Sequence, residues 1–205
     1  MTKIKNLVFD IGGVLIGYRW GEMLKDYGLN EEDADRVGGI IFTDPIWHDF
    51  DRGIVEFEDL ISHYVEGYPE DATHLEYFLR NCELIRVNRP AVWDRVKKLK
   101  SLGYKIYILS NYAESLLNMH IKDMVLFNEV DGKIISYQVK SIKPEPEIYK
   151  ALYEKYDLDP EECLFFDDRQ DNVEGSEATG MKAIKVESEE HLNKVLDEII
   201  EKGKP

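Results

Sequence analysis

Carboxylates, a lysine and small polar residues recur where apolar segments of this sequence end or a helix is about to begin. Seven residues with these properties could do chemistry: Asp10, Gly12, Ser110, Asn111, Lys143, Asp167 and Asp168. Carboxylate oxygens are the ligands that Mg²⁺ prefers, usually one or two of them together with phosphate and water. A lysine nearby supplies the counter-charge for an anion. These residue types therefore predict a site for a hard cation and a small anion.

Alternating predicted strands and helices would bring these residues together. Residues 4–9 read as a buried strand, and after Pro90 short β-prone runs at 104–111, 163–166 and 182–186 alternate with helical patterns. Such alternation indicates a parallel sheet with helices on both faces. In open parallel sheets the ligand lies at the carboxyl ends of the strands. The residues that follow the strands should therefore share one edge of the sheet.

The segment after the first strand has a different character. From residue 18 to about residue 83 we find no convincing strand, only short amphipathic helical patterns. Gly28 is suited to end one helix, Asn30 to cap the next, and Asp44 with Pro45 to begin a third. We therefore expect an α/β fold: a Rossmann-like core of residues 1–15 and 88–205, with helices on both faces of a parallel sheet. A small all-helical cap of residues 16–87 would be inserted after the first strand.

Composition excludes several classes of function. The chain has 205 residues and a formal net charge of −15, which disfavours binding to nucleic acids and to anionic membranes. No apolar run approaches the roughly 20 residues of a membrane helix, and the first apolar run is interrupted by Asp10, so we expect a cytoplasmic protein. Cys82 and Cys163 suggest neither a zinc site nor a disulfide framework, and Cys163 should be a buried thiol.

Four motifs occur in a suggestive order: FDIGGVL at 9–15, LSN at 109–111, KPEPEIY at 143–149 and FFDDRQDN at 165–172. With them the chain resembles the haloacid dehalogenase superfamily, whose many phosphatases form an aspartyl-phosphate. The helical insertion lies where this family places its cap. Within the family the chain most resembles the small cytoplasmic sugar-phosphate phosphatases of the glucose-1-phosphate phosphatase type, whose first motif also has the form D-x-G or D-x-N.

The resemblance implies roles for the catalytic and phosphate-binding residues. Asp10 would be the nucleophile, because a carboxylate that attacks phosphorus splits the hydrolysis into two easier steps. Lys143 would neutralise charge between the nucleophile and the phosphoryl group. Ser110 and Asn111 would bind phosphate oxygens, although both residue types are also common as helix caps.

The same resemblance implies a Mg²⁺ site. Its ligands would be Asp10, the backbone carbonyl of Gly12 and Asp168, with Asp167 acting directly or through a water. Two further polar residues would orient these ligands or Lys143: Asp171 and Asn172. Adjacent carboxylates after an apolar strand need compensation once they are buried, and a metal ion provides it.

Position 12 departs from the commonest family pattern. Most of these phosphatases have an acid–base Asp two residues after the nucleophile, which is worth about 10²–10⁴-fold in rate, whereas this chain has Gly12. Turnover could be slow, the substrate could have a good leaving group, or another group could supply the proton. His48 in the cap is a candidate donor, although a histidine on an amphipathic helix face is the simpler interpretation. Arg19 could reach a phosphate or a sugar. The missing acid also disfavours a phosphomutase.

The leading hypothesis is a Mg²⁺-dependent phosphatase for a small phosphorylated metabolite, with a sugar phosphate favoured. A metal-independent dehalogenase of the same fold would use Asp10 to displace halide, but it would lack the acidic pair at 167–168. A catalytically weak binding or regulatory protein is favoured by Gly12 and disfavoured by Asp10, Lys143 and Asp168 together. The sequence leaves the substrate and the oligomeric state open.

Overall fold

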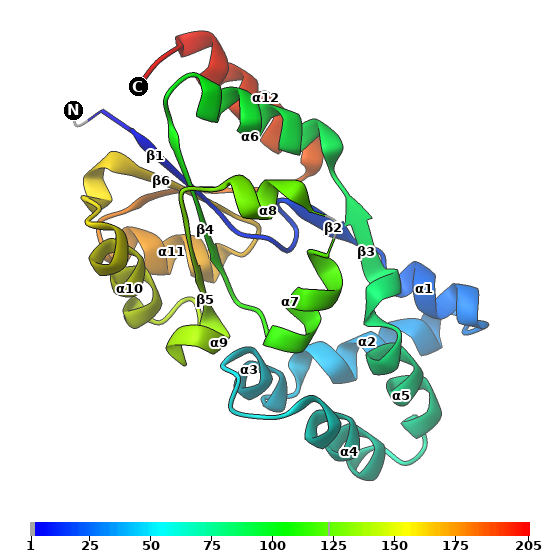
Figure 1. Cartoon of the computed structure of the whole chain (residues 1–205). Helices are drawn as coiled ribbons and strands as arrows, with labels where there is room; N and C mark the ends of the chain where they lie inside the picture. Colours follow the sequence, from blue (N-terminus) through cyan, green and yellow to red (C-terminus); the bar gives the residue numbers. More distant parts are fainter. Residues whose placement is uncertain (1–2, 123) are drawn as a thin grey trace.

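A five-stranded parallel sheet forms the centre of the molecule (Figure 1). The structure, a computed structural model, describes residues 3–122 and 124–205. In spatial order the strands are β5 (Gly132–Ile135), β4 (Lys105–Ser110), β1 (Asn6–Phe9), β6 (Cys163–Asp167) and β7 (Lys182–Lys185). Since β4, β1 and β6 are neighbours, the residues that follow these three strands lie side by side at one edge. The predicted α/β class is confirmed.

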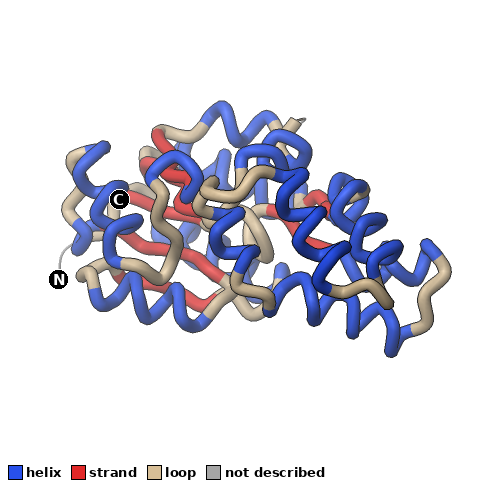
Figure 2. Tube along the Cα trace, turned by 90° about the horizontal axis from the view of Figure 1, so that it is seen from below, coloured by secondary structure: helices blue, strands red, loops and turns tan. Residues whose placement is uncertain are grey.

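Helices cover both faces of this sheet, as the turned view in Figure 2 shows. Successive side chains of a strand point to opposite faces, so Leu7 and Phe9 pack in one cluster while Val8 packs in another. The first cluster includes residues of α6 (Pro90–Ser101) and α12 (Glu189–Lys202). The second includes residues of α10, and α11 packs on β6 and β7 beside it. The bounds of these two helices are Pro146–Tyr156 and Gln170–Ala178.

A group of helices between β1 and β4 stands apart from the sheet, at the lower right of Figure 1. Its elements are α1 (Trp20–Tyr27), α2 (Glu31–Thr43), α3 (Ile46–Asp51), α4 (Phe57–Gly67), α5 (Ala72–Arg80) and the 3₁₀ turn η1 (Cys82–Ile85). We call residues 20–85 the cap. Its apolar side chains, among them Leu24, Val37 and Phe78, are buried in the same cluster as the core helices α6 and α12.

Two short strands connect the cap to the core. β2 (Ile16–Tyr18) and β3 (Arg86–Asn88) form an antiparallel ribbon in which Tyr18 lies opposite Arg86. The sequence analysis did not anticipate this ribbon, because three-residue strands are too short to show a period-two pattern. The ribbon matters for the site, since it fixes the position of Tyr18.

The predicted helix ends in the cap are largely confirmed. Gly28 ends α1 with φ of 113°, a left-handed conformation that favours glycine. The side chain of Asn30 accepts a hydrogen bond from the N–H of Asp33 at the start of α2. Asp44 caps α3 by accepting from the N–H of Ile46, so the helix begins one residue later than we predicted.

The remaining elements are short: α7 (Glu114–His120), α8 (Val125–Glu129), α9 (Ser136–Val139) and the 3₁₀ turn η2 (Pro160–Glu162). Cys163 is a buried free thiol, as expected, and Cys82 is one as well. Among the described residues no helix has the length and apolar character needed to cross a membrane.

Candidate active site

Asp10 lies directly after the central strand β1, where its carboxylate meets groups from two other segments. Its Oδ1 accepts hydrogen bonds from the hydroxyl of Ser110 at 2.5 Å and from the N–H of Ile11 at 2.7 Å. The ammonium of Lys143 is 2.9 Å from the same oxygen. Burial raises the pKa of Asp10 to about 7, Lys143 opposes the rise, and the carboxylates of Asp167 and Asp168 add to it. A cation bound beside Asp10 would favour its ionised, nucleophilic form.

Lys143 is held in the interior, with only 3% of its surface exposed. Its Nζ lies 2.6 Å from Oδ2 of Asp167, in addition to its contact with Asp10. Burial acts to lower the pKa of Lys143, but the two carboxylates together raise it. The Asn111 amide fixes the loop, since it donates to the Lys143 carbonyl at 3.0 Å and accepts from the Lys143 N–H at 2.7 Å. Lys143 is therefore a charged ammonium aimed at the predicted nucleophile, and not a solvated surface residue.

Asp10, Asp167 and Asp168 offer carboxylate oxygens that all lie within 4.8 Å of one another. Burial raises the pKa of Asp168, and the neighbouring Asp167 raises it further. Gly13 permits this approach: its φ is +68°, and a Cβ there would lie 2.5 Å from Oδ2 of Asp168. Three crowded carboxylates with one ammonium leave an excess of negative charge. The cluster therefore fits a divalent cation with oxygen ligands, which Mg²⁺ is.

Asp167 is the most constrained of the three carboxylates, since it is completely buried. Its oxygens accept from Nδ2 of Asn172 at 3.0 and 3.1 Å and from the N–H of Arg169 at 2.9 Å, besides the contact with Lys143. Asn172 thus orients Asp167, which is one of the two roles predicted for it. Asp171 instead pairs with Arg169 at 2.6 Å. Oδ1 of Asn172 is buried without a hydrogen-bond partner.

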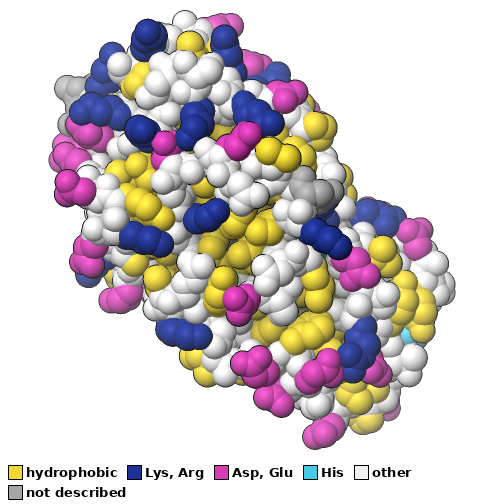
Figure 3. Space-filling model, in the orientation of Figure 1, with side chains coloured by type: hydrophobic (Ala, Val, Ile, Leu, Met, Phe, Trp, Pro, Cys, Tyr) yellow, Lys and Arg dark blue, Asp and Glu magenta, His cyan; other side chains and the backbone are white. Residues whose placement is uncertain are grey.

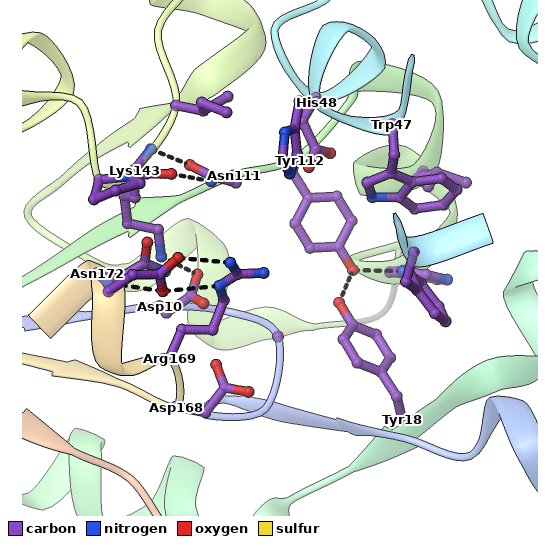
Figure 4. Close-up of a pocket in the computed structure, with 18 of the residues that line it drawn as sticks. Asp10, Tyr18, Trp47, His48, Asn111, Tyr112, Lys143, Asp168, Arg169 and Asn172 are labelled. Atoms are coloured by element: carbon purple, nitrogen blue, oxygen red, sulfur yellow. Dashed lines mark hydrogen bonds and ion pairs between the residues drawn. The ribbon is translucent and has the colours of Figure 1, made fainter. Parts of the chain in front are cut away.

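Beside the carboxylates a cavity of about 550 Å³ opens between core and cap. Figure 4 shows Asp10, Lys143 and Asn172 on one side of it, with Tyr18, Tyr112, Trp47 and His48 across from them. Six of its lining residues come from the cap: Trp20, Phe42, Trp47, His48, Asp51 and Ile85. All seven predicted site residues except Ser110 and Asp167 also line it. These two are buried behind Asp10 and Lys143, to which they hydrogen-bond.

Two residues of the cap predicted from the sequence differ in their position relative to the cavity. His48 lines the cavity as an exposed side chain. Arg19 does not lie among the lining residues, because its guanidinium turns outward to Asp26 at 2.5 Å. The expectation that Arg19 reaches the ligand therefore finds no support in the structure.

The space around position 12 is filled from another part of the chain. A Cβ built on Gly12 would lie 2.7 Å from the hydroxyl oxygen of Tyr18 and 2.8 Å from the Tyr18 ring. The phenol thus occupies the room that a side chain at position 12 would need. Burial raises the pKa of Tyr18, and the negative charges of Asp10 and Asp168 contribute to the rise.

The sequence analysis missed several residues of the cavity wall. Asp51 is one: burial raises its pKa to about 7, and the charge of Asp10 adds to the rise. Nothing in the segment IWHDFDRG distinguishes Asp51 from its acidic neighbours. Tyr112, His120 and Arg169 line the cavity as well. Tyr112 and Arg169 follow LSN and FFDD directly, so their proximity to two strand ends was an available signal.

Comparisons with known proteins agree with this geometry. The model of a hydrolase family, haloacid dehalogenase-like hydrolase, matches residues 4–180. A pyrophosphatase PpaX of Bacillus mycoides is 27% identical over 90% of this chain and 84% of its own length. A phosphatase of Mycobacterium tuberculosis is 28% identical over 90% of this chain and 88% of its own length.

A solved structure is also similar. A HAD family enzyme of Bacteroides thetaiotaomicron, determined in complex with magnesium and inorganic phosphate, has 25% sequence identity and a TM-score of 0.69. The similarity covers 89% of this chain and 93% of that chain.

Proposed function

The chain belongs to the haloacid dehalogenase-like hydrolases, and we propose that it is a Mg²⁺-dependent phosphatase that hydrolyses a small phosphorylated metabolite through an aspartyl-phosphate on Asp10. The observation that carries the proposal is the buried ammonium of Lys143, which lies 2.9 Å from Asp10 and 2.6 Å from Asp167. Burying charged groups costs stability, so a buried lysine among carboxylates is typical of a functional site.

The charge balance supports a divalent metal at this place. Asp10, Asp167 and Asp168 bring three carboxylates against the single ammonium of Lys143. Asp10 and Asp168 are the side chains that would hold Mg²⁺, with the carbonyl of Gly12 as a further ligand. We assign Asp167 chiefly to the positioning of Lys143, because both of its oxygens already accept hydrogen bonds. When bound, Mg²⁺ would polarise the phosphoryl group and neutralise its charge.

The residues of the chain then divide the work. A carboxylate oxygen of Asp10 attacks phosphorus, and the ammonium of Lys143 stabilises charge on the phosphoryl oxygens. Ser110 keeps Asp10 oriented through its 2.5 Å hydrogen bond and can turn its hydroxyl to phosphate. Asn111 holds the Lys143 loop, and its backbone N–H, directly after β4, can bind a phosphate oxygen.

The cavity limits the substrate class. A volume of about 550 Å³ lies within the range of small-molecule sites, which is about 300–1,000 Å³. The cap contributes the rings of Trp20, Phe42 and Trp47 to the wall, together with the carboxyl of Asp51. Aromatic faces with few polar groups suit the apolar face of a sugar, while its hydroxyls would bind at Asp51 and His48. A sugar phosphate is therefore the finer proposal.

The dehalogenase alternative is less well supported. It needs no metal, and the carboxylates of Asp167 and Asp168 beside Asp10 would then be uncompensated charge. The binding-protein alternative does not explain why Lys143 is aimed at a carboxylate directly after β1.

Hydrolysis of p-nitrophenyl phosphate tests the proposal. The wild type should release phosphate only with Mg²⁺, and Asp10→Asn should retain less than about one thousandth of the activity because the nucleophile is lost. Asp35→Asn, which removes an exposed charge from α2, is the matched control and should be fully active. Halide release from 2-chloropropionate in EDTA would instead support the dehalogenase. Turnover that survives either EDTA or Asp10→Asn would refute the phosphatase mechanism.

A further inference from the structure

A line of hydrogen bonds runs along the cavity wall from Tyr18, beside position 12, to His120. The hydroxyls of Tyr18 and Tyr112 are 2.6 Å apart, and the Tyr112 hydroxyl is 2.5 Å from Nδ1 of His120. Nε2 of His120 is 2.7 Å from the backbone carbonyl of Cys82. Figure 4 shows Tyr18 and Tyr112 joined in this way on the side of the cavity opposite Lys143.

The fixed end of this line sets the direction of every proton in it. A carbonyl can only accept, so Nε2 of His120 carries a proton. In the neutral imidazole Nδ1 is then an acceptor, and Tyr112 must donate to it. The Tyr112 oxygen is therefore free to accept from Tyr18, whose own oxygen presents a lone pair to the cavity. If His120 gains a second proton at Nδ1, the bond between His120 and Tyr112 and the bond between Tyr112 and Tyr18 both reverse, while Nε2 still donates to Cys82, and Tyr18 can donate into the cavity.

The two ends of the line differ in access. Tyr18 is 39% exposed, whereas His120 is 1% exposed. Burial lowers the pKa of His120, and the positive charge of Arg86 lowers it further. The hydrogen bond to the Cys82 carbonyl and the negative charge of Glu83 act to raise this pKa. His120 is therefore mostly neutral near pH 7, and the relay starts from the fraction that has taken up a second proton at Nδ1, which is readily passed on along the hydrogen bonds to Tyr18.

We propose that Tyr18 is the proton-transferring residue that replaces the missing side chain at position 12, with Tyr112 and His120 as the store of the proton. The proposal rests on the phosphatase function above and adds its acid–base group. It is carried by two observations: the Tyr18 phenol fills the room of a side chain at Gly12, and its hydroxyl is the cavity end of the hydrogen-bonded line.

In the first step the proton moves outward. An oxygen of Asp10 forms a bond to phosphorus, the bond from phosphorus to the ester oxygen breaks, and the leaving alkoxide takes the proton of Tyr18. Tyr18 takes the proton of Tyr112, and Tyr112 takes the Nδ1 proton of His120. The products are the free alcohol, the aspartyl-phosphate and a neutral His120.

In the second step the proton returns. The oxygen of a water molecule bonds to phosphorus, and the bond from phosphorus to the Asp10 oxygen breaks, which releases the carboxylate. The water proton passes to Tyr18, the Tyr18 proton to Tyr112, and the Tyr112 proton to Nδ1 of His120. Phosphate leaves, and the relay is again charged for the next ester.

The experiment compares two esters with different leaving groups. Glycerol 2-phosphate releases a basic alkoxide that needs a proton, whereas p-nitrophenyl phosphate releases a stable phenolate that does not. Tyr18→Phe keeps the ring and removes the hydroxyl, so kcat on glycerol 2-phosphate should fall about 10²–10⁴-fold and kcat on p-nitrophenyl phosphate less than about fivefold. Tyr112→Phe should show the same selectivity to a smaller degree. Tyr27→Phe, on an exposed cap tyrosine stacked on Tyr77, is the control.

Equal losses on both esters, or no loss with Tyr18→Phe, would overturn the relay. If Asp51→Asn, and not Tyr18→Phe, lost activity selectively on glycerol 2-phosphate, the proton donor would be the Asp51 carboxyl of the cap instead. A wild type inactive on both esters would refute the proposed function itself, which is a separate outcome.

Two further measurements test the direction of the hydrogen bonds and the space at position 12. Nitrogen-15 NMR of the imidazoles, with His120→Gln to assign the signal, should show His120 as the Nε2–H tautomer; a neutral Nδ1–H tautomer would contradict the line of bonds. Gly12→Asp should lower activity in the wild type, where Tyr18 fills the space, but raise glycerol 2-phosphate turnover about tenfold or more in Tyr18→Ala. The same effect in both backgrounds would contradict the shared space.

Discussion

At the scale of single residues, the site depends on side chains that crowd charge together and on a glycine that lets them do so. Gly13 has φ of +68°, and any Cβ there would lie 2.5 Å from Oδ2 of Asp168. The backbone conformation and the approach of the carboxylate therefore both need a residue without a side chain. Gly12 differs, because no positive φ requires a glycine there and what a Cβ would meet is the phenol of Tyr18 and not a carboxylate of the cluster.

Gly13→Ala should damage both stability and metal binding. The strained φ costs about 1–2 kcal/mol, and the displaced Asp168 loses its place in the carboxylate cluster. We expect the melting temperature in EDTA to fall by about 2–4 °C per kcal/mol and the rise on adding Mg²⁺ to be lost. Gly21→Ala is the control, because nothing lies within 4 Å of its Cβ in α1; it should be neutral or slightly stabilising. An unchanged Mg²⁺ response in Gly13→Ala would show that Asp168 does not need this glycine.

At the scale of elements, the cap is tied to the core by α3 and the loop that carries Lys143. Arg52 at the end of α3 pairs with Glu145, which directly precedes α10. Nearby, the hydroxyl of Ser136 donates to the Asp51 carbonyl at 2.5 Å and Lys140 donates to the Gly53 carbonyl at 2.6 Å. These contacts hold Asp51 and His48 against the cavity, so they couple cap position to the site.

Arg52→Gln should therefore weaken substrate binding more than chemistry. The pair is partly exposed, at 22% and 36% of the side chains, so its loss is worth no more than about 1 kcal/mol. We expect KM for a phosphorylated metabolite that the enzyme hydrolyses to rise about two- to fivefold, with kcat on p-nitrophenyl phosphate changed less than about twofold. Arg80→Gln removes an ion pair between the cap helices α5 and α4 and another within α5, and it should leave KM unchanged. A larger effect on kcat than on KM would mean that Arg52 supports the chemistry itself.

The elements also show how far the sequence could be interpreted. The strands β1, β4 and β6 were predictable, because each contains a short apolar run that is followed by small polar or acidic residues. The ribbon of β2 and β3 was not, since three residues carry no period, and with it the position of Tyr18 was lost. The proposed proton relay joins Tyr18 to Tyr112, 94 residues further along the chain, and to His120 shortly after it, so only the folded chain brings it together.

At the scale of the whole molecule, charge dominates. The formal net charge is −15, yet Figure 3 shows Lys and Arg side chains interspersed with Asp and Glu on the face it presents. The pH dependence of stability should therefore come less from the surface charges than from the crowded carboxylates of the site. Burial raises the pKa of Asp10 and of Asp51 from the ordinary 3.8 to about 7, and the pKa of Asp168 is raised as well.

These shifts give the stability of the metal-free protein a definite pH dependence. Between about pH 4 and pH 7 the folded chain binds more protons at Asp10, Asp51 and Asp168 than the unfolded chain does, because the pKa values of these three carboxyls are higher in the folded chain; their contribution to the free energy of unfolding therefore falls as pH rises through this window. In EDTA the melting temperature should thus drop between about pH 5 and pH 7.5.

Asp10→Asn should flatten this drop and be the more stable protein at the higher pH, since it removes one of the crowded charges. Mg²⁺ should raise the wild-type melting temperature at the higher pH and much less at the lower, because protons compete with the metal for the carboxylates. Asp35→Asn removes the same unit of charge from the surface of α2, so an identical slope in the two variants would mean that the buried cluster is not the source.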